Sequence, residues 1–217
     1  MKLYTSYLSN AAYRVRIALD LKDLPYEPEY VLLSKDTGED QSPEYLGINP
    51  LGMVPTLIDG HRVYRQSLSI LEYLEDVYPV PSILPGSSRD RERIRSLSLV
   101  IATDIEPLTN FRIQAYMNDK LSLNDEQCAQ WNRHWIHKGL QALEKLMEDN
   151  PATSSFCHGD LPTMADICLV SQVHGYEQQG WDLNQYPTVA RIYQQCMNLS
   201  AFSSTAPQYQ PDAQVQT

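Results

Sequence analysis

The segment PVPSILPGSS, residues 79–88, constrains the fold of this chain most, because it separates two stretches with different secondary-structure patterns. It holds three prolines and one glycine in ten residues, a composition typical of a linker between domains. Strand patterns occur before this segment, and no β-rich run follows it. We therefore predict an α/β domain over residues 1–80 and an all-helical domain over residues 88–217, which suits a chain of 217 residues.

The residues before this segment show the element order β-α-β-α-β-β-α of a thioredoxin-like domain. Apolar spacing predicts strands over residues 2–6, 26–33, 53–59 and 62–66, and helices over residues 11–22, 42–49 and 67–78. The short crossover between the first two strands favours a parallel pair, and Asp59-Gly60 indicates a hairpin turn between the last two.

In the second domain, a helix that starts at Arg89 should end or kink at Pro107, because proline lacks the backbone donor that a helix needs. Further helices are expected over residues 124–149 and 188–198. Another should start at Thr163, which stands in the reciprocal capping relation to Asp166. The Pro- and Gln-rich tail, residues 206–217, is expected to fray at its end.

Composition excludes several classes of function. A net charge of -10 argues against nucleic-acid binding, which needs clustered cations. The chain shows neither a signal-peptide pattern at its start nor an apolar run long enough for a membrane helix. Its four cysteines are far apart in the sequence and are expected to be free thiols. We therefore expect a cytoplasmic protein without a nucleic-acid or membrane partner.

Ser9 is the first candidate for chemistry, because it stands at the predicted start of the first helix. Unpaired N–H groups and the helix dipole favour negative charge at such a position. A hydroxyl there can donate a hydrogen bond to a thiolate, and the same field lowers the pKa of the thiol. A plain N-cap is the simpler interpretation of the local sequence.

Two further pairs occupy similar positions in the same domain. Val54-Pro55 precedes a predicted strand, and a cis peptide there could leave the Val54 backbone free to pair with a bound peptide. An edge-strand proline is the alternative. Gln66-Ser67 combines an amide with a predicted helix-cap hydroxyl, where a ligand carboxylate could bind. Together with Ser9, these pairs indicate a site for an extended, anionic, thiol-bearing peptide.

Other candidate residues are better explained by ordinary structure. His134 and His137 are three apart on a predicted helix, but the sequence shows no third ligand with suitable spacing, so we expect no metal. Cys157 and His158 are adjacent on a loop, where side chains rarely face each other. Tyr4 and Tyr7 are alternative hydroxyls near the first turn.

Several motifs together resemble the glutathione S-transferases, most closely the zeta class that includes maleylacetoacetate and maleylpyruvate isomerases. The motifs are YRVRIAL, SPEYLGINPLGMVPTL, QSLSILEYLE, DIEPLTN, GDLPTMADICLVSQV and QPDA, spread over almost the whole chain. The resemblance implies a thioredoxin-like domain that binds glutathione, a helical domain that binds a small electrophilic substrate, and a homodimer. It also implies thiolate addition to a conjugated cis double bond, rotation, and elimination to the trans product, in aromatic amino-acid catabolism.

The resemblance assigns roles to individual positions. Ser9 matches the serine that activates the thiolate, and Val54 matches the residue whose backbone holds the cysteinyl part of glutathione. The positions implied to bind glutathione are Asn10, Asp40, Val54, Pro55, Gln66, Ser67, Glu106 and Asn110.

The chain also departs from the zeta pattern. Ser9-Asn10-Ala11 stands where the class has serine-serine-cysteine, and Leu8 stands where relatives that bind a diacid commonly have arginine. A second arginine is replaced by Glu177 or Gln178, and Glu106 stands where glutamine or histidine is more usual.

These departures affect the predicted binding of the substrate more than that of glutathione. Arginine binds carboxylates strongly and directionally, so the loss of two arginines should weaken binding of a dicarboxylate substrate. Leu8, Arg14 and Arg112 are therefore the expected substrate-binding positions, the two arginines as possible compensating cations. We predict a zeta-type isomerase. The alternatives are a transferase or dehalogenase for a less charged electrophile, and a catalytically weak protein that binds ligands or partners.

Overall fold

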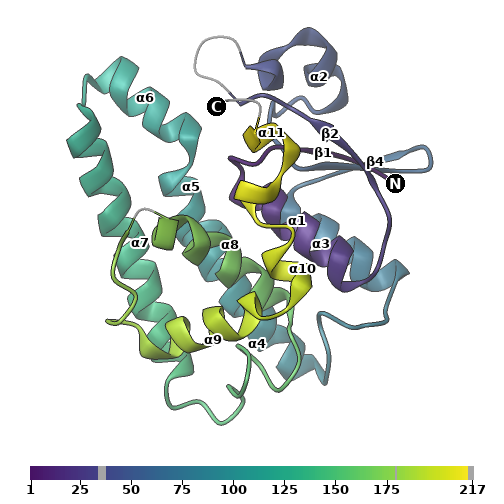
Figure 1. The fold of residues 1–217 in the computed structure, drawn as a ribbon, viewed down its shortest axis with the longest axis vertical. Coiled ribbons are helices and arrows are strands. Elements are labelled where there is room, and N and C mark those ends of the chain that lie inside the picture. The colour runs from purple at the N-terminus through teal and green to yellow at the C-terminus, as the bar shows by residue number, and fades with distance from the viewer. Residues whose placement is uncertain (34–37, 179, 215–217) are drawn as a thin grey trace. The chain divides into compact units, whose positions relative to one another are not determined.

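The computed structural model describes residues 1–33, 38–178 and 180–214, and it divides the chain into two compact units (Figure 1). Unit 1 contains Met1–Ile83 and Met197–Thr217, and unit 2 contains Leu84–Cys196. The predicted helical domain, residues 88–217, included the C-terminal residues. Contacts instead group residues 197–217 with the N-terminal part, because α10 (Ser200–Ser203) packs against α1 (Asn10–Leu21).

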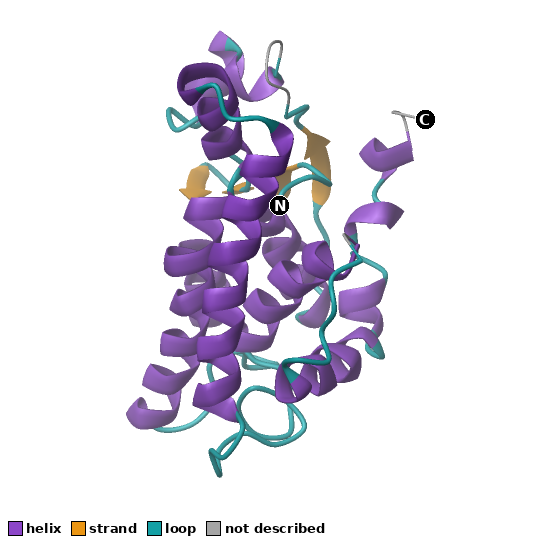
Figure 2. Cartoon of the chain, turned by 90° about the vertical axis from the view of Figure 1, so that its left-hand side faces the viewer, coloured by secondary structure: helices purple, strands orange, loops and turns teal. Residues whose placement is uncertain are grey.

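Unit 1 is built on a mixed sheet, whose strands are orange in Figure 2. The sheet has four strands in the order β2-β1-β3-β4. Its strands are β1 (Lys2–Thr5), β2 (Glu27–Tyr30), β3 (Thr56–Asp59) and β4 (Arg62–Arg65). β1 pairs with β2 in parallel and with β3 antiparallel, and β3 and β4 form the predicted hairpin. The thioredoxin-like order is confirmed, although β2 and β3 are shorter than predicted.

Helices α1 and α3 (Ser67–Val77) pack against each other in unit 1. Every residue of α1 from Ala12 to Leu19 is buried, whereas α3 buries one face that includes Ile70, Leu71 and Leu74. Between β2 and β3 lie η1 (Glu39–Gln41), which is one turn of 3₁₀-helix, and the short helix α2 (Pro43–Ile48). Ser42 caps α2 by accepting a hydrogen bond from Tyr45 N–H, and Pro43 supplies the preset φ of a first helical residue.

The first part of the predicted linker is tied to unit 1. The ammonium of Lys22, the residue that ends α1, is buried and lies 2.9 Å from the carboxylate of Glu75 on α3. It also donates to the carbonyls of Tyr78 and Pro81, both at 2.7 Å. Glu75 in turn accepts from Ile83 N–H. Residues 78–83 therefore have fixed partners, which the proline content did not indicate.

The regular elements of unit 2 are helices, joined by loops, one of which holds an isolated β-bridge between Thr153 and Gly159. Its elements are α4 (Ser88–Leu99), the π-helical segment η2 (Val100–Ile105), α5 (Glu106–Thr109), α6 (Phe111–Leu121), α7 (Asp125–Met147), α8 (Met164–Gln178) and α9 (Pro187–Met197), which ends at the boundary. The helix predicted from Arg89 begins at Ser88 and becomes π-helical at Val100, and it does not end at Pro107, which lies in the first turn of α5. Helix α6 was not predicted.

Local capping explains where the long helices of unit 2 begin. Ser87 with Asp90 and Asn124 with Gln127 form reciprocal capping boxes at α4 and α7. At the start of α8, the buried carboxylate of Asp166 accepts from both the N–H and the hydroxyl of Thr163. The predicted pairing of these two residues is therefore present.

The C-terminal tail is folded as far as it is described. After α10 come η3 (Pro207–Tyr209) and α11 (Pro211–Gln214), and the predicted fraying at the very end falls on residues 215–217, outside the described residues. Among the described residues no helix is long and apolar enough to cross a membrane. All four cysteines are free and buried.

Candidate active site

The turn between β1 and α1 places Ser9 at the N-terminus of α1. Ser9 has an extended backbone, and its Oγ accepts a hydrogen bond from Ala12 N–H at 3.1 Å, so the predicted N-cap is present. The same Oγ lies 3.5 Å from the carbonyl oxygen of Val54, a long distance for a hydroxyl hydrogen bond. Ser9 therefore uses a lone pair for the cap and has no short acceptor for its proton among these contacts.

Val54 lies beside Ser9, just before β3. The Val54-Pro55 peptide bond is cis, one of the two alternatives that the sequence left open. Among the hydrogen bonds of the described residues, the Val54 N–H has no acceptor. Its backbone polar groups are therefore available to pair with an extended ligand.

Side chains from α2 and the following turn fix the segment that carries Val54. Tyr45 and Asn49 both donate to the carbonyl of Met53, at 2.8 and 2.7 Å. Both also contact the Thr56 hydroxyl, at 3.0 and 3.1 Å. Sequence reasoning missed this network. Asn49 is only 2% exposed, and its sequence context gave no sign of that burial.

Gln66 and Ser67 lie at the N-terminus of α3. Gln66 is the exposed N-cap, with φ of 69° and no side-chain hydrogen bond to the helix end. Ser67 is the first helical residue and not the cap, so the predicted capping role of its hydroxyl is wrong. Its Oγ accepts from the guanidinium of Arg14 at 3.3 Å. The helix end therefore keeps backbone donors that can receive an anion.

The other residues of unit 1 that were predicted to bind glutathione or substrate are Leu8, Asn10, Arg14 and Asp40. Leu8 is 52% exposed, and Asn10 is the half-buried first residue of α1. Arg14 is 1% exposed, so its guanidinium supports Ser67 from inside the unit. Asp40 lies in η1, where one carboxylate oxygen accepts from Gln41 Nε2 and the other is buried without a hydrogen bond.

Three predicted residues belong to unit 2. Glu106 begins α5, and Asn110 caps α6 through a hydrogen bond from Arg112 N–H to its Oδ1 at 3.0 Å. The Arg112 side chain is exposed and makes no hydrogen bond or ion pair with the described residues. These are the observed places of the residues, and their contacts with a ligand stay predictions.

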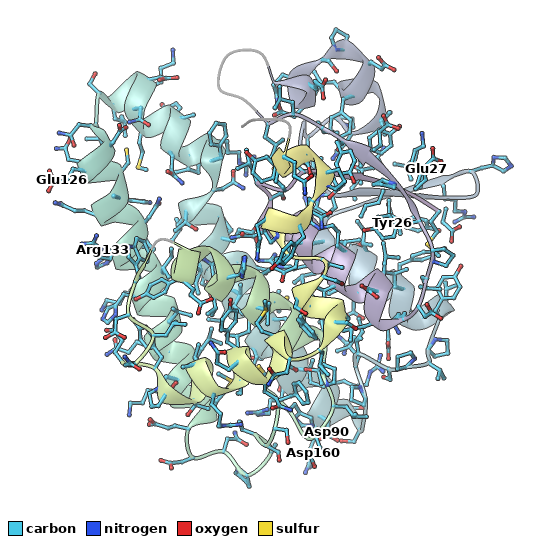
Figure 3. The ribbon with its side chains drawn as sticks, viewed as in Figure 1. Tyr26, Glu27, Asp90, Glu126, Arg133 and Asp160 are labelled. Carbon is cyan, nitrogen blue, oxygen red and sulfur yellow. The ribbon has the colours of Figure 1, made fainter. Side chains whose placement is uncertain are left out.

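The weaker candidates have structural roles. Burial raises the pKa of the Cys157 thiol well above its ordinary value, which disfavours a thiolate. His158 contacts Arg93 and Asp90. His134 and His137 line a cavity of about 470 Å³ within unit 2, together with Arg133. Arg133 projects from α7 (Figure 3), and its guanidinium lies over the ring of Trp181. Neither Ser9 nor Val54 lines this cavity.

Comparison with known proteins identifies the family. Residues 3–82 match the family model of the glutathione S-transferase N-terminal domain. A probable maleylacetoacetate isomerase of Vibrio cholerae is 42% identical over 211 residues, which cover 97% of each chain. The holo structure of a maleylpyruvate isomerase, a bacterial zeta-class glutathione S-transferase, is 37% identical with a TM-score of 0.94 over 98% of this chain and 99% of that one. The chain belongs to the zeta class of the glutathione S-transferases.

A maleylacetoacetate isomerase of Methylobacterium extorquens with bound malonate and glutathione is also similar, 39% identical with a TM-score of 0.93 over 97% of this chain and 98% of the other. The predicted resemblance and the glutathione S-transferase fold are thus confirmed. Membership in this class makes the chain a glutathione-dependent enzyme. The residues of unit 1 fit that cofactor, since they offer a hydroxyl proton, a free backbone N–H and an open helix N-terminus.

Proposed function

We propose that the chain catalyses glutathione-dependent cis-trans isomerisation of maleylacetoacetate or a similar cis-configured dicarboxylate, in aromatic amino-acid catabolism. The observation that carries the proposal is the hydrogen-bonding state of Ser9. Its Oγ accepts from Ala12 N–H, so the orientation of the hydroxyl is fixed while its proton remains available. Such a hydroxyl at a helix N-terminus can donate to a sulfur anion and favour the ionised form.

The other predicted glutathione contacts follow from the chemistry of each group. The free N–H and the carbonyl of Val54, positioned by the cis bond to Pro55, can pair with the cysteinyl backbone. The open N-terminus of α3, with Gln66 and Ser67, can receive the γ-glutamyl carboxylate. We assign further glutathione contacts to Asn10, Asp40, Glu106 and Asn110.

The chemistry divides between the cofactor and the protein. Bound glutathione supplies a thiolate that adds reversibly to the conjugated cis double bond, so that the carbons can rotate before the sulfur leaves and the trans double bond forms. Ser9 keeps the sulfur ionised by donating its proton as a hydrogen bond, without transferring it. Arg14 contributes by holding the Ser67 hydroxyl at 3.3 Å. The guanidinium of Arg112, which has no partner among residues 1–33, 38–178 and 180–214, could pair with a substrate carboxylate.

The test compares wild-type protein with Ser9→Ala. Ionisation of bound glutathione is titrated by the ultraviolet absorbance of the thiolate, and isomerisation of maleylacetoacetate is assayed in parallel. Losing one donor to a developing or full anion typically costs about 100-fold or more in rate, so kcat/KM should fall by about that factor while the pKa of the bound thiol rises.

Ser42→Ala is the matched control, because Ser42 caps α2 in the same way that Ser9 caps α1. Each substitution should lower the free energy of unfolding by about 1 kcal/mol, but Ser42→Ala should leave the thiol pKa unchanged. Equal turnover in the two variants and the wild type would contradict the role of Ser9. Failure of the protein to bind immobilised glutathione would contradict the whole proposal.

A second candidate function is transfer of glutathione to a less charged electrophile, or glutathione-dependent dehalogenation. The exposed Leu8 favours it, because an apolar side chain beside Ser9 offers no partner for a carboxylate. Conjugation assays with neutral electrophiles separate the two functions. Turnover of neutral electrophiles without isomerisation would favour the second one. Glutathione binding without either activity would indicate a ligand-binding protein.

We further propose that the protein is a cytoplasmic homodimer. The four free, buried cysteines suit a reducing compartment. Apolar side chains on two helices of unit 2, Leu99 on α4 and Trp131 on α7, are 43% and 37% exposed and could be covered by a second copy. Light scattering after size-exclusion chromatography tests the dimer, and a monomer at assay concentration would contradict it.

A further inference from the structure

The C-terminal segment returns to the turn that carries Ser9. Asp212 on α11 accepts a hydrogen bond from Tyr7 N–H through Oδ2 at 2.8 Å. Tyr7 is two residues before Ser9, and 205 residues separate the two partners in the chain. In Figure 1 the yellow α11 lies beside the purple segment between β1 and α1. This contact lies entirely within unit 1.

The same turn is held from inside unit 1 by Arg16. Its Nη1 donates to the Thr5 hydroxyl at 2.9 Å and to the Ser6 carbonyl at 3.2 Å. The Ser6 carbonyl also accepts from Ser9 N–H at 3.2 Å, which closes the turn. Arg16 is fully buried, so its hydrogen bonds form where water cannot replace them.

Arg16 also reaches the C-terminal segment. Its Nε donates to the carbonyl of Thr205 at 3.2 Å, and that carbonyl accepts a second hydrogen bond from Gln210 Nε2 at 3.2 Å. One turn earlier, the Tyr13 hydroxyl donates to the carbonyl of Phe202 at 2.6 Å. Residues 202–212 are thus fixed to α1 at several points before α11 reaches Tyr7.

The charges around this network compensate one another. Burial lowers the pKa of Arg16 to about 10, and the coulombic effects of Tyr26 and Asp212 act in the opposite direction. Tyr26 lies next to Glu27 at the start of β2 (Figure 3). A carboxylate near the turn is therefore matched by a buried guanidinium, which limits its repulsion of a bound anion.

We propose that the C-terminal segment, residues 197–214, acts as a clasp on the β1–α1 turn, and that Asp212 is a positioning residue for Ser9. The hydrogen bond from Tyr7 N–H holds the outer part of the turn, while Arg16 holds the inner part. The position of the Ser9 hydroxyl relative to a bound thiolate depends on the hydrogen bond to Asp212 and on the hydrogen bonds of Arg16. The expected effect on catalysis rests on the proposed function of Ser9. The clasp itself rests only on the hydrogen bonds described above.

The first experiment compares Asp212→Ala with Asp212→Asn by the thiolate titration and the isomerase assay. Alanine removes the acceptor, whereas asparagine keeps an oxygen that can accept from Tyr7 N–H. We expect Asp212→Ala to raise the pKa of the bound thiol by about 1 unit and to lower kcat about 10-fold, the equivalent of one net hydrogen bond, with an unchanged KM for glutathione. Asp212→Asn should restore both values.

Asp182→Ala is the matched control, because Asp182 Oδ1 likewise accepts from a backbone N–H in a loop, that of Asn184 at 2.8 Å in unit 2. It should leave the thiol pKa and kcat unchanged. Equal losses in Asp212→Ala and Asp212→Asn overturn the hydrogen-bond assignment. Wild-type values in Asp212→Ala overturn the positioning role.

The second experiment measures hydrogen exchange of the Tyr7 and Ser9 amides in the full-length protein without glutathione. The clasp predicts about 10-fold faster exchange at both amides in Asp212→Ala, with wild-type rates in Asp212→Asn and Asp182→Ala. Unchanged exchange overturns the clasp. If Ser9→Ala does not alter the thiol pKa while exchange is accelerated in Asp212→Ala, the proposed function of Ser9 fails and the clasp stands.

Discussion

At its N-terminal end, α1 is capped by the neutral, half-buried hydroxyl of Ser9, whereas at its C-terminal end the ammonium of Lys22 is buried against Glu75. The Lys22 group has three acceptors within 2.9 Å, all from unit 1. For the Ser9 proton, the part of the chain that the structure describes offers one acceptor oxygen, that of Val54 at 3.5 Å. A buried charge needs fixed protein partners, while a partly exposed hydroxyl can keep its donor for a ligand.

The largest expected effect concerns the C-terminal end. Lys22→Met leaves the Glu75 carboxylate buried without its cation, which should lower the free energy of unfolding by about 3–5 kcal/mol. Lys2→Met is the control, because the Lys2–Glu29 pair at 3.1 Å is exposed, so water screens it and its loss should change the free energy of unfolding far less. Denaturant unfolding measures both. A similar small loss in the two variants would contradict the comparison.

The double variant Lys22→Met/Glu75→Leu separates charge from packing. Replacing both charges by apolar groups removes the uncompensated carboxylate, so we expect recovery of most of the stability that the single variant loses. Absence of recovery would show that the hydrogen bonds to the carbonyls of Tyr78 and Pro81 matter more than the ion pair.

The Lys22–Glu75 pair at the C-terminal end of α1 should also make the free energy of unfolding depend on pH in the acid range. Burial by itself raises the pKa of Glu75, but hydrogen bonds from Ser82, from Ile83 N–H and from Lys22 outweigh it and hold the pKa below 4.5. Because the folded pKa is lower than the unfolded one, the stabilisation is complete above about 4.3 and is lost as the pH falls through the folded pKa. Unfolding free energies of Glu75→Gln should therefore fall less steeply in acid than those of the wild type. Parallel profiles would exclude Glu75 as a source of acid sensitivity.

The functional side of the comparison extends to the N-terminus of α3, where Gln66 has φ of 69°. Gln66→Gly removes the amide but suits the backbone, since glycine adopts positive φ without steric cost. Glutathione affinity should fall about 10-fold, as for loss of a hydrogen bond to a charged group, while thermal stability is kept or raised. Titration calorimetry measures the affinity.

Ser122→Gly is the control for Gln66→Gly, because Ser122 also has a positive φ, 56°, but lies in unit 2 after α6. It should not change glutathione affinity. If both variants bind glutathione as the wild type does, Gln66 does not contribute its side chain to the site.

The smallest expected effect concerns Leu8, the exposed neighbour of Ser9. Leu8→Arg should raise kcat/KM for a dicarboxylate substrate about 5-fold, because a partly exposed ion pair contributes at most about 1 kcal/mol. Leu8→Met is the neutral control. Steady-state kinetics with maleylacetoacetate measure kcat/KM for both variants. No gain in Leu8→Arg would count against the argument that the substrate-binding site lacks an arginine at this position.

Prediction from sequence succeeded where structure is local. The Ser9 cap, the hairpin at Asp59-Gly60 and the pairing of Thr163 with Asp166 each involve residues that are close in the chain. Helix α6 was missed although its apolar residues have helical spacing, and Ser67 was taken for the cap of α3, one residue too late. The second error is a shift of one residue in the helix boundary, which is the least certain part of a prediction from sequence.

The candidate site was predicted in part. Sequence and family resemblance pointed to Ser9, Val54 and Gln66, and the structure places Ser9 and Val54 next to each other. The support for these residues was not predictable. Asp212, for example, binds Tyr7 N–H across almost the whole chain. A single sequence contains no signal for which distant polar groups will meet.

The sequence by itself determined the two kinds of domain and the starts of most long helices, because periodicity, capping and turn chemistry act over a few residues. The tertiary structure alone decided that Lys22 would be buried with Glu75 and that the tail would close on the turn at Ser9. Burial gives these polar contacts their energy, and burial exists only after distant segments have packed together.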